Sequence, residues 1–194
     1  MKRASKVISL IVLLGIIFLA GWWLLSGKFT TTIKTSAQKT TLIEASKSLG
    51  FAVPAPDYLP NNYEIKEIYV GVSSAYLLIS DKEIEEKLVA RTSKNGTNQE
   101  YEFKCSMKIS ISWHGGGIPG GIKIPGKHPK ITPIQGITES YPIVSRLTYN
   151  TLWWHWRPKS DDPGMYSISI TANKHVSMGE LVKVAESMRL INVE

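Results

Sequence analysis

Apolar and polar residues alternate without a break from position 107 to position 113 of this chain. The apolar members are Met107, Ile109, Ile111 and Trp113, and the polar members are Lys108, Ser110 and Ser112. A period of two is that of a β-strand, whose successive side chains point to opposite faces of a sheet. The segment therefore predicts a strand that buries one face in a core and leaves the other face wet.

Several other segments also predict strands of an antiparallel sheet, from alternating polarity or from β-branched and aromatic composition. These are Tyr63–Val70, Ser74–Ser80, Glu85–Thr92, Glu100–Trp113, Ser140–Tyr149, Thr151–Arg157 and Met165–Ala172. Asn95-Gly96 lies between two of them, and this dipeptide is the strongest short-range signal for a β-hairpin. The middle of the chain is therefore predicted to be a meander.

Two segments have helical spacing instead. The first begins near Ser36 and ends before Gly50, a residue suited to terminating a helix. Its apolar residues are Leu42, Ala45 and Leu49. The second opens with an S-x-x-E capping box, Ser177 and Glu180, ahead of an apolar helical face. We expect an α+β fold: a curved, half-barrel-like antiparallel sheet with helices packed on one face.

The first 25 residues predict a membrane anchor. Lys2, Arg3 and Lys6 precede an uncharged stretch of 19 residues, Val7–Leu25. As a helix this stretch is about 28 Å long, close to the hydrocarbon thickness of a bilayer. Basic residues ahead of a span favour a cytoplasmic amino end. A cleaved signal peptide is the alternative, although its apolar region is usually shorter.

The expected organisation follows from that anchor. Residues 1–25 are predicted to be a cytoplasmic stub and a transmembrane helix, 26–35 a linker, and 36–194 an extracytoplasmic domain. The chain is then a single-pass protein of the cell membrane, with its amino end in the cytoplasm. The prediction makes the membrane a partner of the chain.

Charge and cysteine content narrow the functional classes. The formal charge is +7, and the 20 basic and 16 acidic residues that follow the amino end leave +4 for the rest. No run of five like charges occurs, so nucleic acid is not an expected partner. Cys105 is the single cysteine, which excludes an internal disulfide and favours a small buried apolar residue over a nucleophile.

A glycine-rich segment has the spacing of a phosphate-binding loop. Gly121–Lys127 reads G-x-x-x-x-G-K, but His128 stands where a hydroxyl would hold magnesium, and Pro129 makes an immediate helix unfavourable. No nucleotide is therefore expected. The segment instead predicts a partner-contact loop, with a plain connection between strands as the alternative. Its contact residues are Ile118, Ile122, Lys123, Ile124, Lys127 and His128.

The tryptophan-rich segment Thr151–Arg157 predicts two different faces. Leu152, Trp154 and Trp156 share the face expected in the core. Trp153, His155 and Arg157 share the other face, which could form a shallow stacking platform for a sugar or a cationic group. Burial of these side chains in the core is the competing interpretation.

Catalytic and metal motifs are missing from the sequence. There is no G-x-S-x-G motif, and the four histidines are too irregularly spaced for a helical ligand pair or a zinc-finger framework. They are His114, His128, His155 and His175. We expect no cofactor, no metal and no catalytic residue. A hydrolase acting on the cell envelope is a rival hypothesis, which requires His155 or His128 near a carboxylate.

Two segments resemble a known family. Leu49–Ile65, "LGFAVPAPDYLPNNYEI", resembles a signature built on P-x-Y-L-P-x-G-Y, with Asn62 in place of the usual glycine. Met165–Met188 is similar to the closing strand and serine-capped helix of the same family. The family is an extracytoplasmic domain of unknown function on the outer side of membrane-anchored sigma-factor regulators. The resemblance implies a prokaryotic protein with a fold like lipoprotein carriers and periplasmic stress sensors, and it brings no catalytic residues.

The predicted function combines these points. We expect a non-enzymatic, membrane-anchored domain that binds a protein partner or an envelope ligand, as a sensor or accessory subunit. With six residues before the predicted span, we do not expect a sigma-binding domain. The alternative is a carrier or binding protein for a lipid or other apolar ligand in the half-barrel. The identity of the partner stays open.

Overall fold

The computed structural model describes residues 29–60, 62–93, 96–114, 137–140, 144–145, 148–157 and 164–191. This part of the chain contains 13 strands and two helices. The strands of the first half are β1 (Phe29–Lys34), β2 (Gln38–Thr40), β3 (Pro54–Pro56), β4 (Glu64–Val70), β5 (Ser74–Ser80), β6 (Glu85–Ser93) and β7 (Gly96–Cys105). Those of the second half are β8 (Met107–His114), β9 (Ile137–Ser140), β10 (Val144–Ser145), β11 (Tyr149–Arg157), β12 (Met165–Asn173) and β13 (Met188–Leu190). The helices are α2 (Leu42–Leu49) and α3 (Met178–Glu186).

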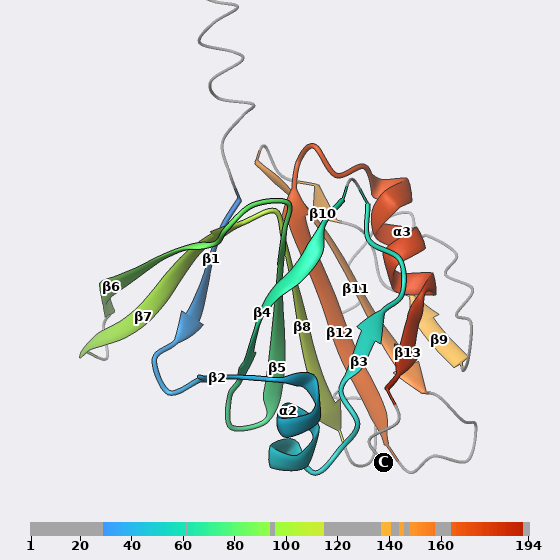
Figure 1. Ribbon diagram of the computed structural model, residues 1–194, viewed down its shortest axis with the longest axis horizontal. Helices are drawn as coiled ribbons and strands as arrows, with labels where there is room; N and C mark the ends of the chain where they lie inside the picture. Colours follow the sequence, from blue (N-terminus) through green and yellow to red (C-terminus); the bar gives the residue numbers. More distant parts are fainter. Residues whose placement is uncertain are drawn as a thin grey trace, which may run out of the picture.

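Eight strands form the main sheet, which is antiparallel at every pairing. The strand order is β10-β11-β12-β8-β5-β4-β2, and β9 also pairs with β11 (Figure 1). At its centre, Ile111 of β8 lies opposite Ile168 of β12 on one side and opposite Ala75 of β5 on the other. Residues whose side chains point to the same face are thereby aligned across neighbouring strands, so the polarity of each face is consistent from strand to strand.

Two smaller sheets complete the fold. One has three strands in the order β1-β7-β6, and we call it the small sheet. The other is a two-stranded ribbon in which β13 pairs with β3. Only Ser106 separates β7 from β8, so one run of backbone belongs first to the small sheet and then to the main sheet. The β6–β7 hairpin extends away from the main sheet, to the left in Figure 1.

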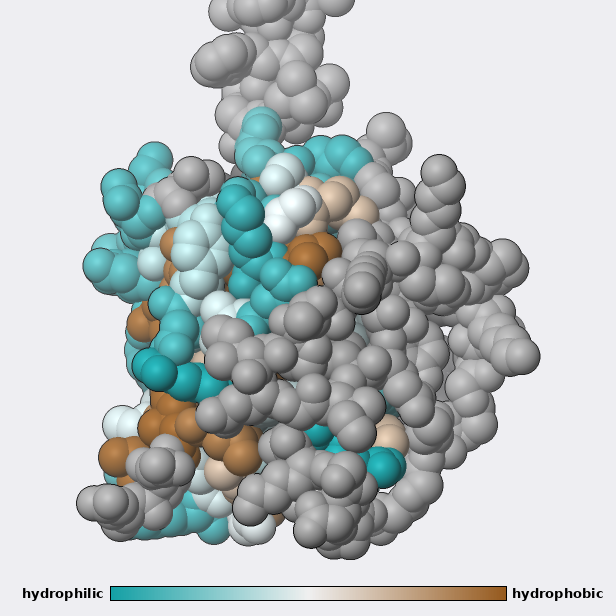
Figure 2. All heavy atoms as spheres, turned by 90° about the vertical axis from the view of Figure 1, so that its right-hand side faces the viewer, coloured by the Kyte–Doolittle hydropathy of each residue, from teal (hydrophilic) through white to brown (hydrophobic). Residues whose placement is uncertain are grey.

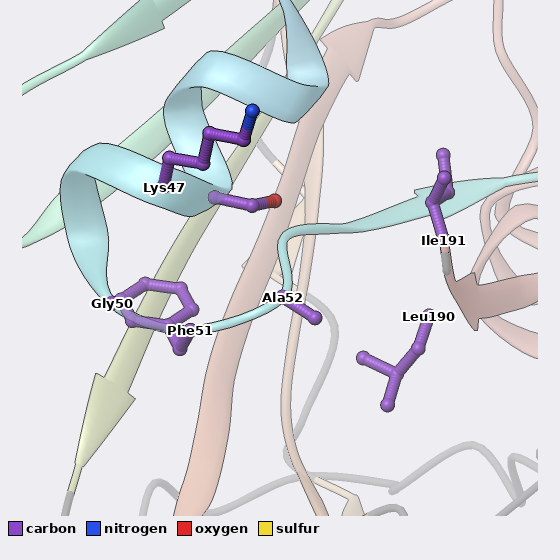
Figure 3. Close-up of a pocket in the computed structure, with 7 residues that line it drawn as sticks. Lys47, Gly50, Phe51, Ala52, Leu190 and Ile191 are labelled. Atoms are coloured by element: carbon purple, nitrogen blue, oxygen red, sulfur yellow. The ribbon is translucent and has the colours of Figure 1, made fainter. Parts of the chain in front are cut away.

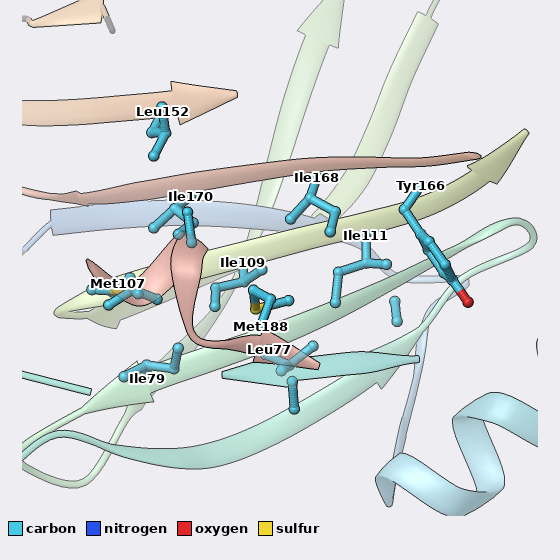
Figure 4. Packing of buried hydrophobic residues seen from close by; sticks show 14 of the residues in the cluster. Leu77, Ile79, Met107, Ile109, Ile111, Leu152, Tyr166, Ile168, Ile170 and Met188 are labelled. Atoms are coloured by element: carbon cyan, nitrogen blue, oxygen red, sulfur yellow. The ribbon is translucent and has the colours of Figure 1, made fainter. Parts of the chain in front are cut away.

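The larger core lies on one face of the main sheet. Its best-buried side chains are apolar and come from alternate positions of the central strands, as the period-two pattern requires. Those with no exposed surface include Leu77, Ile79, Met107, Ile109, Ile111, Leu152, Ile168 and Ile170 (Figure 4). Residues of α2, α3, β3 and β13 pack against the same cluster, so these four short elements cover that face.

A second core lies between the small sheet and the opposite face of the main sheet. It joins Phe29 and Ile33 of β1 and Phe103 of β7 to Tyr69 and Leu78 of the main sheet. The rings of Tyr69 and Phe103 have centroids 5.0 Å apart. This contact and the rest of the second core pack the base of the small sheet against the main sheet.

Both helices are capped by hydroxyl side chains. Thr41 accepts a hydrogen bond from the Glu44 backbone N–H, and the Glu44 carboxylate bonds back to the Thr41 N–H, which completes a capping box. α2 ends as predicted, because Gly50 takes a left-handed φ of 72°. Ser177 caps α3 by accepting from the Glu180 N–H.

The α+β class predicted from the sequence is wrong, because strands dominate the described chain and its two helices have eight and nine residues. The structure is mostly antiparallel β-sheet. Both helices are shorter than their apolar spacing suggests: Gln38–Thr40 pairs with β4 ahead of α2, and Met188–Leu190 pairs with β3 after α3. Strand pairing with a distant segment overrides helical spacing at these positions.

The predicted transmembrane anchor lies outside the described residues. Among the helices that the structure does describe, none is long and apolar enough to cross a membrane. The single-pass topology, the membrane as a partner and the extracytoplasmic location in the cell membrane are corrected accordingly, and we do not retain them.

The segment 26–35, predicted as a linker, contains β1. The side chains of Phe29, Thr31 and Ile33 are buried, and those between them lie outward. β1 pairs with β7 along its whole length. The tether prediction is wrong for these residues, because threonine is polar but β-branched and is favoured in strands.

Candidate functional site

The predicted contact residues of the glycine-rich loop, from Ile118 to His128, lie outside the described residues, as does the G-x-x-x-x-G-K motif. The candidate sites of the described chain lie on its sheets and helices.

The predicted stacking residues lie on β11, on the face opposite the larger core. Trp153 and His155 are in ring contact, with centroids 5.1 Å apart and planes at 69°. The Trp153 indole N–H donates to the Ser167 hydroxyl of β12 at 2.9 Å. His155 is 3% exposed, so no ligand can stack on its ring in this conformation, and Arg157 is partly exposed. The core assignment of Leu152, Trp154 and Trp156 is confirmed.

Hydroxyl groups surround these rings. We call this area the polar face; its partly buried members on β8, β11 and β12 are Ser110, Ser112, Thr151, Ser167, Ser169 and Thr171. The Ser112 hydroxyl lies 3.4 Å from Nε2 of His114, at the outer limit of a hydrogen bond. His114 has no carboxylate partner among the described residues. The pair therefore lacks the third group that orients a catalytic imidazole.

His155 has a different environment from His114. Its neighbours across the sheet are Ser167 on β12 and, by backbone register, Glu139 on β9. The hydrolase hypothesis asked for a carboxylate near this histidine, and the register places an acidic residue opposite it. Burial of the ring nevertheless denies a substrate direct access to it. Across the described chain, no three histidine, cysteine or acidic side chains are grouped to hold a metal ion.

Cys105 and Lys108 lie near the junction of the two sheets. Cys105 is 1% exposed, and burial raises the pKa of its thiol to about 12. It is therefore a protonated, apolar group at neutral pH, as its predicted role required. Burial lowers the pKa of Lys108. Its ammonium points at the Thr32 carbonyl oxygen at 3.5 Å, a long and weak contact.

A pocket opens where α2 ends. Its volume is about 330 Å³, and its walls come from α2, the turn after it and the end of β13 (Figure 3). The lining residues are Ser46, Lys47, Gly50, Phe51, Ala52, Leu190 and Ile191. No sequence signal predicted this site, because the two walls come from opposite ends of the described chain.

The hairpin arm, defined as β6 and β7, has an open edge. β7 lies between β1 and β6, whereas β6 pairs with β7 alone among the described strands. Every described side chain of β6 is exposed except Val89, which is partly buried. Leu88 is 52% exposed although it lies opposite Tyr101 on the face that leads to the second core. The Asn95-Gly96 signal predicted the hairpin but not that β6 would be an edge.

The described surface is otherwise short of large exposed apolar side chains. Besides Leu88 they are Ile43, Tyr58 and Val72. In the view from the right-hand side of Figure 1, the coloured atoms show apolar residues gathered low on the left and mainly hydrophilic residues above them (Figure 2). Apolar exposure is therefore local, at the arm, the helix α2 and single turns.

No protein-family model, curated protein or solved structure matches this chain. The resemblance of Leu49–Ile65 and Met165–Met188 to a family of regulator domains thus stays a prediction.

Proposed function

We propose that this chain is a binding domain without chemistry of its own, and that it binds a protein partner along the outer edge of β6. The observation that carries the proposal is the open edge of the hairpin arm. A nine-residue strand pairs on one side only among the described strands. Such an edge offers a row of backbone N–H and C=O groups to another strand.

An extended segment of a partner supplies the missing hydrogen bonds by adding a strand to the sheet. The arm suits this mode because it extends beyond the main sheet (Figure 1), so an added strand meets no other part of the described chain on that side. On the inner face of the arm, Leu88 offers an apolar contact to the added strand, and Tyr101 of β7 lies opposite Leu88 behind it.

Charges on the arm limit indiscriminate pairing. Glu85, Glu86 and Lys87 are exposed near the base of β6, and Lys104 pairs with Glu85 at 2.8 Å. Charged side chains are a common means by which edge strands avoid aggregation. Specific rather than general pairing is therefore expected along β6.

A carrier with an apolar ligand inside the half-barrel is less well supported. The apolar face of the main sheet is filled by α2, α3, β3 and β13, and its central side chains have no exposed surface. Interiors packed in this way leave no room for an acyl chain without rearrangement.

Site-specific photo-crosslinking tests the proposal. A photoreactive phenylalanine analogue replaces Leu88 in the full-length chain, expressed in its source cells. The matched control carries the same analogue at Val72, which is 95% exposed on the β4–β5 turn. We expect a protein cross-linked at fixed stoichiometry from position 88 and not from position 72.

Substitution of the same two positions adds a quantitative readout. Leu88→Lys should reduce co-purification of the cross-linked protein at least fivefold, and Val72→Lys should leave it unchanged. Equal cross-linking from both positions, or no adduct from position 88, would overturn the proposal. A cross-link between two copies of this chain would make the partner a second copy.

A further inference from the structure

The pocket at the end of α2 owes its shape to a local backbone reversal. Gly50 adopts a left-handed conformation, and its N–H donates to the Ser46 carbonyl oxygen at 3.0 Å. The chain thereby turns back, so that Phe51 and Ala52 lie beside Ser46 and Lys47. Leu190 and Ile191 form the opposite wall across the opening, as Figure 3 shows.

The turn is held from both sides. The Ser46 hydroxyl accepts from the Val53 N–H at 2.9 Å and donates to the Leu42 carbonyl oxygen at 2.9 Å. The Tyr166 hydroxyl donates to the Ala52 carbonyl oxygen at 2.7 Å. With both ends anchored, the pocket is preformed, and a ligand would not have to order the turn on binding.

An aromatic cluster supports the pocket floor. Phe51 stacks on Trp113 with centroids 6.3 Å apart, and it meets Tyr166 edge-on at 5.9 Å. Trp113 and Tyr166 are themselves in contact at 4.7 Å. The floor is therefore apolar and fixed by interlocking rings.

The opening carries one charge. Lys47 is the only charged side chain among the described residues that line the pocket. It is exposed and forms no ion pair within the described chain. The nearest acid along the helix, Glu44, bonds to the hydroxyls of Thr40 and Thr41, and the Coulombic effect of Lys47 is the smallest of the causes that lower the Glu44 pKa. The Lys47 ammonium is thus available to an anion at the opening.

From these features we infer that the pocket binds a single-chain amphiphile with a carboxylate head. The apolar body lies between Phe51, Ala52 and Leu190, and the carboxylate pairs with Lys47. A volume of about 330 Å³ is at the lower end for ligand pockets. It suits one short alkyl chain or one ring, whereas a two-chain lipid is too large.

The carboxylate head is preferred over an amine for an electrostatic reason. An amine would lie beside the Lys47 ammonium and be repelled, whereas a carboxylate gains an ion pair. The gain is small because Lys47 is exposed and water screens the pair. Head-group selectivity should therefore be modest, and most of the affinity should come from the apolar walls.

The test uses the full-length chain in detergent-free buffer, because detergent would compete for an apolar pocket. Decanoate, decanol and decylamine are titrated by calorimetry, and the amide NMR signals of Gly50, Phe51 and Ala52 report the location. We expect decanoate to bind tightest and to shift these signals. Lys47→Gln should weaken decanoate binding about two- to fivefold without affecting decanol. Lys82→Gln, the same charge change outside the pocket lining, should change neither.

Ala52→Phe fills the pocket and should weaken both decanoate and decanol at least tenfold. Near-UV circular dichroism of the aromatic cluster checks that this variant is folded; Leu190→Ala, which shortens the opposite wall, is the second variant if it is not. Equal affinity for the three head groups, or signal shifts away from residues 50–52, would overturn the inference. Leu88→Lys should leave decanoate binding unchanged, so the result does not depend on the protein partner.

Discussion

The hydroxyl of Tyr166 and the carbonyl oxygen of Ala52 are joined by a hydrogen bond of 2.7 Å. Tyr166 belongs to β12, near the end of the chain, and Ala52 to the turn after α2. The bond therefore fixes the exit of α2 to the main sheet. Tyr166 is 3% exposed, so water cannot replace the hydroxyl without a rearrangement of the packing.

Removal of this hydroxyl should be costly. Tyr166→Phe keeps the ring and deletes the donor, leaving the Ala52 carbonyl without it, and should lower the free energy of unfolding by about 1 kcal/mol. Urea denaturation measures the change. Tyr76→Phe is the control, since the Tyr76 hydroxyl makes no hydrogen bond within the described chain. An equal loss in both variants would show that the bond itself contributes nothing.

Two glycines should respond to alanine with opposite signs. A Cβ on Gly164 would lie 2.5 Å from Cζ2 of Trp113 and 2.6 Å from the His114 carbonyl oxygen, so backbone or ring must move. Gly164→Ala should destabilise by about 1–3 kcal/mol, as overpacking does. A Cβ on Gly179 in α3 meets nothing closer than 3.9 Å.

Gly179→Ala should therefore stabilise α3, by less than the roughly 0.5–1 kcal/mol of a helix interior, because Gly179 lies in the first turn. Thermal and urea unfolding of the two variants measure both changes. A neutral Gly164→Ala variant would mean that Trp113 does not pack against this backbone.

The partly buried Lys108 predicts a pH-dependent difference in stability. Burial disfavours its charged form and lowers its pKa. At neutral pH both folded and unfolded states carry the ammonium, and the folded state bears the cost of burying it. Lys108→Met should therefore be more stable than the wild type at pH 7, on the order of 1 kcal/mol.

The sign at higher pH follows from proton linkage. As pH rises through the folded-state pKa of Lys108 towards its ordinary value, the folded state releases the proton first, so the wild type gains stability. The advantage of Lys108→Met should accordingly shrink between neutral pH and about pH 10. Urea titrations of both proteins across this range test it. A constant difference would show that Lys108 reaches water.

Cys105 should be unreactive in the folded protein. Its thiol is buried and its pKa is raised to about 12, so almost no thiolate exists at pH 8. Iodoacetamide should label it at least a hundredfold more slowly in buffer than in 8 M urea, where the ordinary pKa returns. Mass spectrometry follows the label. Comparable rates would mean that the second core opens readily.

Local patterning was a good guide to the central strands. Met107–His114 pairs on both sides in the register that its alternation implies, because a strict period of two leaves a strand no other way to bury its apolar set. The Gly50 stop was also predictable, since few residues tolerate a positive φ. These features are encoded within a few neighbouring residues.

The short strands were not predictable in the same way. Pro54–Pro56 and Met188–Leu190 form a ribbon although neither has a strand pattern of its own. Each segment is a strand only because it pairs with the other, and three residues are too few to show a period of two in the sequence. This contributed to the wrong α+β prediction, because residues with helical spacing form short strands instead.

The candidate sites show the same difference between features set by neighbouring residues and features set by distant segments. Trp153 and His155 share a face, as alternation along β11 requires, but the burial of His155 depends on what covers that face. The pocket combines Lys47 with Leu190, and the edge of β6 depends on the absence of a neighbouring strand in the described sheets. Such features arise only when distant segments meet.

The single residue between β7 and β8 gives the hairpin arm a mechanical role. The Ser106 N–H donates to the Ile79 carbonyl oxygen at 3.0 Å, and its own carbonyl oxygen accepts from the Asn173 N–H at 2.9 Å. A force on the arm is therefore transmitted through the covalent backbone to β8, which is paired with a strand on each side. Any displacement of the arm therefore acts, through Ser106, on a strand whose Met107, Ile109 and Ile111 side chains have no exposed surface.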